Sequence, residues 1–228
     1  MDQPVRSLCL ESDIAIPSWD GEKAGSFQEF ADEVFAPIYP YICRDIETAW
    51  GRSLEARRVL EIGGGPGNMA LELLNRGVAS LTGLDISEAM LERTSRRLRA
   101  AGLEGKFRAV PGEASTLPFA ERSFDLVFSR GSIQFWPDIP RALREIARVL
   151  SIDGFAFVGG GFGLSTPTEV KQSIHAERNR RMAERPDLHP IPKLNHDEVL
   201  ACALGIGGKA ELAHDGPGHW LLWYPAAK

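Results

Sequence analysis

Five short apolar runs alternate with helical patterns through the middle of the chain. The runs cover residues 57–62, 80–85, 106–110, 124–129 and 154–159, and each is rich in Val, Ile, Leu or Phe. Such runs are typical of strands that are buried on both faces of a sheet. Because strands and helices alternate, the pattern predicts stacked βα units that share a parallel sheet.

Two of the intervening helices have recognisable starts. Ser87 can cap a helix whose sheet-facing positions recur at three- and four-residue spacing from Met90 to Ala101. Asp138 precedes a second helix of this kind, and Pro140 is tolerated there because it falls in the first turn. Each helix is therefore expected to pack one face against the sheet.

The last third of the chain has a different pattern. A short helix follows Asn195 and stops at Gly205, and strands are predicted at residues 209–213 and 219–224 with a turn at 215–218. Two strands so close in sequence indicate a hairpin. The predicted fold class is therefore α/β, with a doubly wound, mostly parallel seven-stranded sheet that ends in a C-terminal antiparallel hairpin.

Two segments lie outside these units. Residues 1–50 are rich in aromatic residues and broken by proline toward their end, and they are predicted to form an N-terminal helical cap segment. Residues 51–228 form the predicted main domain. Within it, residues 166–194 fit no strand or helix of the sheet, so they are predicted to form a lid insert with a helix over 175–185.

Composition and charge narrow the class of protein. The chain has 228 residues, 43% hydrophobic and 25% charged, which suits a globular protein of one domain. Its formal net charge of −5 at pH 7 gives no general attraction to nucleic-acid phosphates or anionic membranes. Neither nucleic acid nor a membrane is therefore an expected partner.

The cysteines indicate whether disulfides or a metal site are expected, and the apolar runs indicate where in the cell the protein is expected. Cys9, Cys43 and Cys202 are far apart and have no metal-ligand spacing, so neither a metal site nor a disulfide framework is expected. No run reaches the ~18 apolar residues that a membrane span needs, and the first residues lack a secretion signal. A cytoplasmic protein is the expectation.

The most informative stretch is residues 59–68, where an apolar strand leads directly into four glycines and then a helical pattern. Glycine allows positive φ and lets a ligand approach the main chain closely. A dinucleotide-binding G-x-G-x-x-G motif starting at Gly63 would need glycine or alanine at position 68, where Asn68 stands. The alternating glycines are instead Gly63, Gly65 and Gly67, and they follow Glu61.

This acid-x-G-x-G-x-G arrangement resembles the class I S-adenosylmethionine-dependent methyltransferases. Residues 111–119, 123–130 and 142–154 resemble three further motifs of that family, in the family's order. The family's small-molecule, ubiquinone/menaquinone-type members are the most similar in pattern. The resemblance implies a Rossmann-like fold, S-adenosyl-L-methionine as cofactor, S-adenosyl-L-homocysteine as product, and methyl transfer to a small-molecule acceptor.

The resemblance also implies roles for particular residues. Glu61 would lie near the methionyl ammonium, and Asp85 would accept both ribose hydroxyls, although Asp85 could instead cap a helix beside Ser87. Glu113 stands where the family usually has Asp, and with the N–H of Ala114 it would contact the adenine edge. The predicted cofactor-binding residues are Glu61, Gly63, Gly64, Gly65, Gly67, Asp85, Ile86, Met90, Glu113, Ala114 and Ser129.

The acceptor is expected beyond the carboxyl ends of the strands, which favours residues 129–136. Arg130 could bind a carboxylate or phosphate, and Ser132 and Gln134 could orient a hydroxyl or amine. Trp136 could flank the methyl group or simply pack on the next helix. Methyl transfer from a sulfonium depends mainly on positioning, so a catalytic triad is not required.

Three further features keep two interpretations each. Tyr39 and Tyr41 could close over the methyl group or pack in the core. A second glycine cluster, residues 159–163 with Gly161 at its centre, could cradle an anionic substrate group or act as a hinge to the insert. The arginines of residues 178–185 could guide an acidic acceptor or form a solvated helix face.

Two other functions remain open at this point. One is an NAD(P)-dependent oxidoreductase on a related sheet, which Asn68 disfavours, and the other is a catalytically inactive S-adenosylmethionine-binding partner protein. The acceptor atom, the use of a general base and the oligomeric state are also left open.

Overall fold

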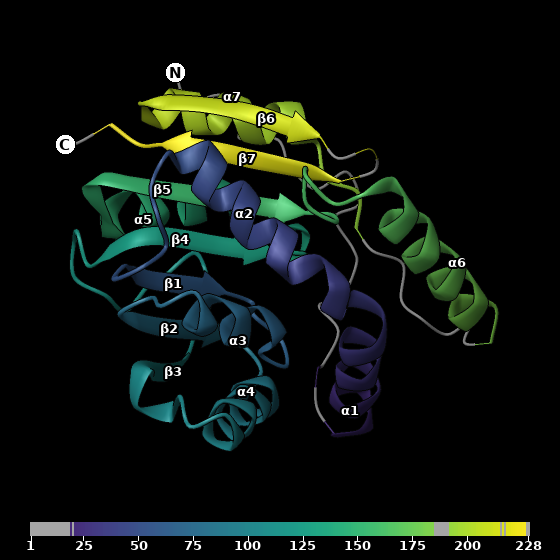
Figure 1. The fold of residues 1–228 in the computed structure, drawn as a ribbon. Coiled ribbons are helices and arrows are strands. Elements are labelled where there is room, and N and C mark those ends of the chain that lie inside the picture. The colour runs from purple at the N-terminus through teal and green to yellow at the C-terminus, as the bar shows by residue number, and fades with distance from the viewer. Residues whose placement is uncertain (1–18, 20, 185–191, 215, 217, 227–228) are drawn as a thin grey trace.

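A seven-stranded sheet forms the centre of the computed structural model, which describes residues 19, 21–184, 192–214, 216 and 218–226 (Figure 1). Its strand order is β3-β2-β1-β4-β5-β7-β6. The strands are β1 Arg58–Ile62, β2 Ser80–Asp85, β3 Phe107–Pro111, β4 Phe124–Arg130, β5 Leu150–Gly160, β6 Lys209–His214 and β7 His219–Tyr224.

Five strands run parallel, and β7 is antiparallel to both of its neighbours, β5 and β6. The predicted doubly wound sheet with a C-terminal antiparallel hairpin is therefore confirmed. Three strands are longer than predicted, β4 and β6 by one residue each and β5 by more. β5 begins at Leu150 because Leu150 pairs with Phe124 while Phe155 pairs with Leu126, so the residues between them form a bulge.

Helices lie on both faces of the sheet. The helices and helical turns are α1 Gly21–Phe30, η1 Ala31–Phe35, η2 Ala36–Ile38, α2 Tyr39–Trp50, α3 Asn68–Asn75, α4 Glu88–Ala100, η3 Glu104–Lys106, η4 Ile133–Phe135, α5 Ile139–Val149, α6 Thr168–Glu184 and α7 His196–Ile206. The side chains of Ser87, Asp138 and Asn195 each accept a main-chain N–H of the first turn of α4, α5 and α7 respectively. All three predicted helix starts are thus present.

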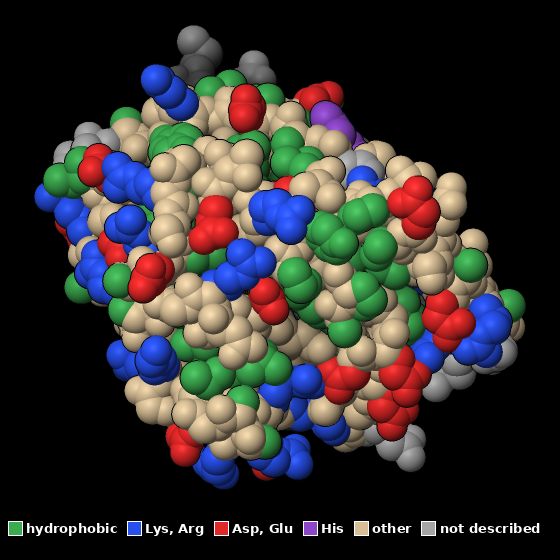
Figure 2. All heavy atoms as spheres, in the orientation of Figure 1, with side chains coloured by type: hydrophobic (Ala, Val, Ile, Leu, Met, Phe, Trp, Pro, Cys, Tyr) green, Lys and Arg blue, Asp and Glu red, His purple; other side chains and the backbone are tan. Residues whose placement is uncertain are grey.

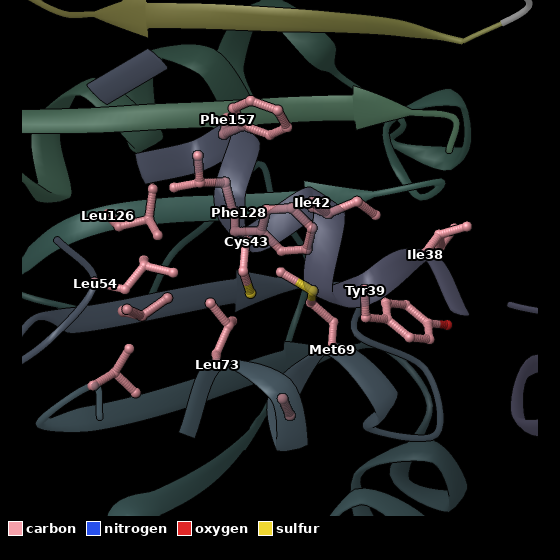
Figure 3. Close-up of a cluster of buried hydrophobic side chains, with 14 of the residues drawn as sticks. Ile38, Tyr39, Ile42, Cys43, Leu54, Met69, Leu73, Leu126, Phe128 and Phe157 are labelled. Carbon is pink, nitrogen blue, oxygen red and sulfur yellow. The ribbon is translucent and has the colours of Figure 1, made fainter. Parts of the chain in front are cut away.

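Alternate residues of the central strands divide the core into two layers. Leu126 and Phe128 of β4 pack with α2 and α3, whereas Val127 packs with α5 and α7. Figure 3 shows the first layer, in which Ile42 and Cys43 of α2 meet the strand side chains. Residues of α2 are fully buried there, so the end of the expected cap segment, residues 39–50, is a layer of the core.

The predicted insert contains one long helix, α6, which begins seven residues before the expected 175. It lies beside η1 at the edge of the molecule (Figure 1). Arg180 and Arg181 pair with Glu177 of the same helix, and Arg181 also pairs with Glu33. His175 packs edge-on against Phe162, with ring centroids 4.8 Å apart.

The remaining expectations concern cysteines and membranes. Cys43 is buried and Cys202 is half-buried, and Cys9 lies outside the described residues. Within the part of the chain that the structure describes, no group of His, Cys, Asp and Glu side chains is arranged to hold a metal ion. No helix among the described residues combines the length and apolarity that crossing a bilayer requires.

The second glycine cluster has a packing reason at its first member. A Cβ on Gly159 would lie 2.0 Å from the carbonyl oxygen of His219, because β7 passes directly over this position. The next residue is different, since a Cβ on Gly160 would have its nearest neighbours, main-chain atoms of Gly131, at 3.6 Å. Close strand pairing therefore requires glycine at position 159 and not at position 160.

We expect Gly159→Ala to destabilise the protein by about 2–3 kcal/mol or more, because the clash is with main chain that cannot rotate away. Gly160→Ala is the matched control and should change the free energy of unfolding by less than about 1 kcal/mol. Urea unfolding followed by circular dichroism gives both values. Equal midpoints for the two variants would contradict this account of the cluster.

Candidate functional site

A pocket opens at the carboxyl ends of the parallel strands, where the loops after β1, β2, β3 and β4 meet the N-terminal helices. Most of the residues predicted to bind a cofactor or an acceptor line this one pocket. They are Glu61, Gly63, Gly64, Gly65, Asp85, Ile86, Met90, Glu113, Ala114, Arg130, Ser132, Trp136 and Tyr39. Gly67, Ser129, Tyr41, Gln134 and Gly161 are not among its lining residues.

The glycine loop is held tightly on both sides. The N–H of Gly63 donates to the carbonyl oxygen of Leu84 at 2.8 Å, and Gly63 has a φ of 68°. A Cβ there would lie 2.4 Å from Cβ of Ser132. The hydroxyl of Thr94 donates to the carbonyl oxygen of Gly65 at 2.9 Å. The loop therefore runs between α4 and the loop after β4, with no room for a side chain at its start.

Glu61 is a buried carboxylic acid at the end of β1, only 2% exposed. Cδ of Glu61 lies 2.6 Å from the place where a Cβ on Gly64 would be, so the bare main chain of the loop rests on the carboxyl group. Among the described residues, no Lys or Arg forms an ion pair with it. Burial, and then the negative charge of Asp85, raise the pKa of Glu61 to about 8.

Asp85 ends β2 and ties the glycine loop to the next helix. Its carboxylate accepts the main-chain N–H of Gly65 at 3.3 Å and that of Ser87 at 2.9 Å. Burial raises the pKa of Asp85, and these two hydrogen bonds oppose that rise. Ser87, not Asp85, caps α4, because its hydroxyl accepts the N–H of Met90. The helix-cap alternative for Asp85 is therefore not what the structure contains.

The far end of the pocket combines apolar and polar side chains. Ile86 is 53% exposed although it is a large apolar residue, and it lies with Met90 at the pocket wall. Glu113 accepts a hydrogen bond from the hydroxyl of Ser115, and Ala114 follows it in the lining. Leu117, which follows shortly after these residues, belongs to the core cluster on the α5 face of the sheet.

Ser132 connects the loop after β4 to the end of β1. Its hydroxyl donates to the carbonyl oxygen of Ile62 at 3.1 Å, accepts the indole N–H of Trp136 at 3.0 Å, and lies 2.7 Å from the hydroxyl of Ser129. Ser129 is fully buried, so it acts on the pocket through Ser132. The structure thus places Ser132 and Ser129 as supports of the pocket wall.

Arg130 contacts Gly161, Phe35 and Tyr39. Its Nε donates to the carbonyl oxygen of Gly161 at 2.9 Å, and its guanidinium lies over the rings of Phe35 and Tyr39, 4.5 and 5.8 Å from their centroids. Gly161 therefore acts through its carbonyl group. Figure 3 shows the hydroxyl of Tyr39 pointing out of the apolar cluster, and Tyr39 lines the pocket.

Two predicted acceptor-binding residues lie elsewhere. The side-chain amide of Gln134 donates to the carbonyl oxygen of Gly131 at 2.9 Å, outside the pocket lining. Tyr41 is half-buried, and the guanidinium of Arg44 lies over its ring, 5.5 Å from the ring centroid. Both residues are therefore engaged with neighbours on their own local segments.

Trp19 and Phe27 line the pocket and were missed as site residues from the sequence. Their ring centroids are 5.1 Å apart, and Trp19 is anchored because its carbonyl oxygen accepts the hydroxyl of Ser87 at 2.5 Å. We refer to Trp19, Phe27 and Tyr39 as the aromatic cover. The aromatic-rich segment before position 41 could have indicated Phe27 as a site residue. No sequence pattern distinguishes Trp19.

Asn68, the residue that breaks the dinucleotide motif, joins the glycine loop to the N-terminal helices. Its amide donates to Oδ1 of Asp32 at 2.6 Å, and Arg97 pairs with the same oxygen at 2.5 Å. Arg97 also donates to the carbonyl oxygen of Pro66 at 2.9 Å. The segment that carries the aromatic cover is therefore fastened to the loop by charged and polar contacts.

Comparisons with known proteins agree with this geometry. A family model described as a methyltransferase domain matches residues 60–158. A solved structure from Methanococcus maripaludis, considered an S-adenosyl-L-methionine-dependent methyltransferase, superposes with a TM-score of 0.80 and 29% identity over 95% of this chain and 98% of that chain.

Two curated relatives are similar over part of their length. The malonyl-[acyl-carrier protein] O-methyltransferase of Halorhodospira halophila is 38% identical over 50% of this chain and 38% of its own length. The ubiquinone/menaquinone biosynthesis C-methyltransferase of Dinoroseobacter shibae is 34% identical over 50% of this chain and 46% of its own. The chain therefore matches less than half the length of either relative.

The fold and the pocket define a Rossmann-like domain with a glycine loop at the edge of its pocket. Residues 60–158 match a methyltransferase domain, the chain is similar to class I S-adenosylmethionine-dependent methyltransferases, and these similarities support S-adenosylmethionine as its cofactor. The expected similarity to ubiquinone/menaquinone-type methyltransferases is present, but the chain is similar to other kinds of methyltransferase as well.

Binding of S-adenosylhomocysteine should release a proton below pH 8. Glu61 is largely protonated in the free protein because its pKa is about 8, and an ammonium beside it favours the ionised form. Affinity should therefore rise by about tenfold per pH unit from pH 6 toward 8, while the ammonium stays charged. Calorimetry in buffers of different ionisation enthalpy counts the protons.

Glu61→Gln should abolish this proton release and flatten the pH dependence. Glu104→Gln changes the same charge at an exposed position on η3 and should behave like the parent protein. A proton count that is unchanged in Glu61→Gln would show that another group titrates on binding.

Proposed function

We propose that this protein transfers the methyl group of S-adenosylmethionine to a small-molecule acceptor. The observation that carries the proposal is the buried carboxyl group of Glu61, which lies under a bare glycine loop and has no ion pair with the described cations. Burying a carboxylate without a partner is costly, so the site fits a ligand that brings a cation.

The residues of the pocket fit the parts of the cofactor in order. Glu61 would hold the methionyl ammonium, and Asp85 would accept the ribose hydroxyls. Glu113 and the N–H of Ala114 would contact the adenine edge, beside the exposed apolar side chain of Ile86. When bound, the cofactor supplies a methyl group that its positive sulfur already activates.

The chain's own contribution to the reaction is alignment and exclusion of water. The aromatic cover closes one side of the pocket, and the loop after β4 forms the facing wall, which Ser132 fixes to β1. Orienting two reactants this way can contribute about 7–11 kcal/mol to lowering a barrier. A general base would add less to the rate than this alignment.

A small molecule is the acceptor that fits the surface. Acidic and basic side chains are interspersed on the face in Figure 2, and the net charge is −5, so nothing favours a polyanion. The two curated relatives are named as an O-methyltransferase and a C-methyltransferase, and their acceptor atoms differ. We therefore propose the class of acceptor and not its acceptor atom.

Asp85→Ala should weaken S-adenosylhomocysteine binding by at least about tenfold, because a hydrogen bond to a charged group contributes about 1.5–3 kcal/mol. Asp153→Ala is the control, since Asp153 is exposed on β5 and contacts Arg52 and Trp50, away from the pocket. Isothermal calorimetry measures both affinities. Undiminished affinity in Asp85→Ala would contradict the proposed cofactor grip.

The activity is tested with a cofactor labelled in its methyl group and a small-molecule extract. Label should move into the small-molecule fraction with the parent protein, and transfer should fall at least about tenfold with Asp85→Ala at limiting cofactor. Tight cofactor binding without transfer across many extracts would favour the inactive partner protein. Binding of a nicotinamide dinucleotide would favour the oxidoreductase.

A further inference from the structure

The charged residues of the pocket are mostly of one sign. Among the described lining residues, Glu61, Asp85 and Glu113 are acidic, and Arg130 is the one basic side chain. The methionyl end of S-adenosylmethionine carries a carboxylate as well as an ammonium. A ligand carboxylate surrounded by these acids would be repelled unless a cation met it.

Arg130 is fixed in a way that suits recognition of a carboxylate. The carbonyl oxygen of Gly161 accepts a hydrogen bond from Nε–H of Arg130, and the guanidinium lies over the ring of Phe35. A planar guanidinium held in one orientation presents its terminal nitrogens as a fork, and that fork matches the two oxygens of a carboxylate. Gly161 and Phe35 therefore set the direction of this fork.

Tyr39 connects the acidic and the basic side of the pocket. Burial raises the pKa of Tyr39, the charge of Arg130 lowers it, and the charge of Glu61 raises it further. Both charges therefore act on the same phenol hydroxyl, which points away from the apolar cluster in Figure 3, and Tyr39 lines the pocket. A cation-binding group and an anion-binding group thus lie around one side chain, as an α-amino acid group requires.

We propose that Arg130 binds the α-carboxylate of the cofactor's methionyl end, while Glu61 binds its ammonium and Tyr39 separates the two. This assignment deepens the proposed function and depends on the same cofactor. It differs from the expectation that Arg130 binds an acidic group of the acceptor. If Arg130 binds the cofactor, recognition of the methyl acceptor does not require an acidic group on the acceptor.

Three ligands test the assignment by calorimetry. S-adenosylhomocysteine has the whole amino acid end, its decarboxylated analogue lacks the carboxylate, and 5′-methylthioadenosine lacks both charged groups. Arg130→Met should weaken S-adenosylhomocysteine binding by roughly 20- to 200-fold and change binding of the other two by less than about threefold. Arg96→Met, an exposed arginine of α4, is the control and should match the parent protein.

The parent protein should itself bind the decarboxylated analogue more weakly than S-adenosylhomocysteine, by about the factor that Arg130→Met loses. Arg130→Lys keeps the charge and should recover part of the affinity, which also covers the case in which Arg130→Met does not fold. Equal loss for all three ligands would show a structural role and overturn the proposal. Unchanged S-adenosylhomocysteine binding in Arg130→Met would also overturn the proposal. It would favour the earlier expectation that Arg130 binds an acidic group of the acceptor.

These outcomes are distinct from failure of the proposed function. If the parent protein did not bind S-adenosylhomocysteine, the cofactor assignment itself would be wrong. If it bound S-adenosylhomocysteine and transferred no methyl group, the assignment of Arg130 would still be tested by the three ligands.

Discussion

The carboxyl group of Glu61 is buried, and no Lys or Arg among the described residues forms an ion pair with it. The glycine loop, Asp85 and Tyr39 line the same pocket. Burial raises the pKa of Glu61 to about 8, whereas in the unfolded chain it would titrate as an ordinary Glu. Since the unfolded state ionises first, the free protein loses stability as pH rises from that ordinary range through about 8. A ligand ammonium beside Glu61 would reverse this penalty, so the residue that weakens the free fold would favour the proposed bound state.

Holding such a group requires rigid surroundings, and the contacts supply them. Asp85 accepts an N–H from the glycine loop, Thr94 donates to the loop from α4, and Ser132 fixes the opposite wall to β1. Each contact joins segments that are far apart in the chain. The loop therefore cannot relax toward water without disturbing the ends of two strands and one helix.

Much of this could be predicted from local patterns, and the exceptions share one cause. The strands could be predicted from the apolar runs, and two helix starts from Ser87 and Asp138. These features depend mainly on residues that are close together in the sequence. Gly159 stood out in the sequence, but its reason is the approach of β7 some sixty residues later. The hydroxyl of Ser132 looked available for an acceptor, yet its partner Ile62 lies 70 residues away. Trp19 gave no signal because a single aromatic residue has no periodicity.

The distribution of contacts explains how one fold can serve different methyl acceptors. In the proposed arrangement, the groups that recognise the cofactor would lie at its two ends, with Asp85 and Glu113 toward the nucleoside and Glu61 toward the amino acid, and all three residues line the pocket. Binding energy placed far from the reacting atom can hold that atom in position without contacting it. The space between the ends is bounded by the aromatic cover and the loop after β4, which shape the acceptor site without chemistry of their own. Changes in those side chains can therefore alter the acceptor while the cofactor stays where it is.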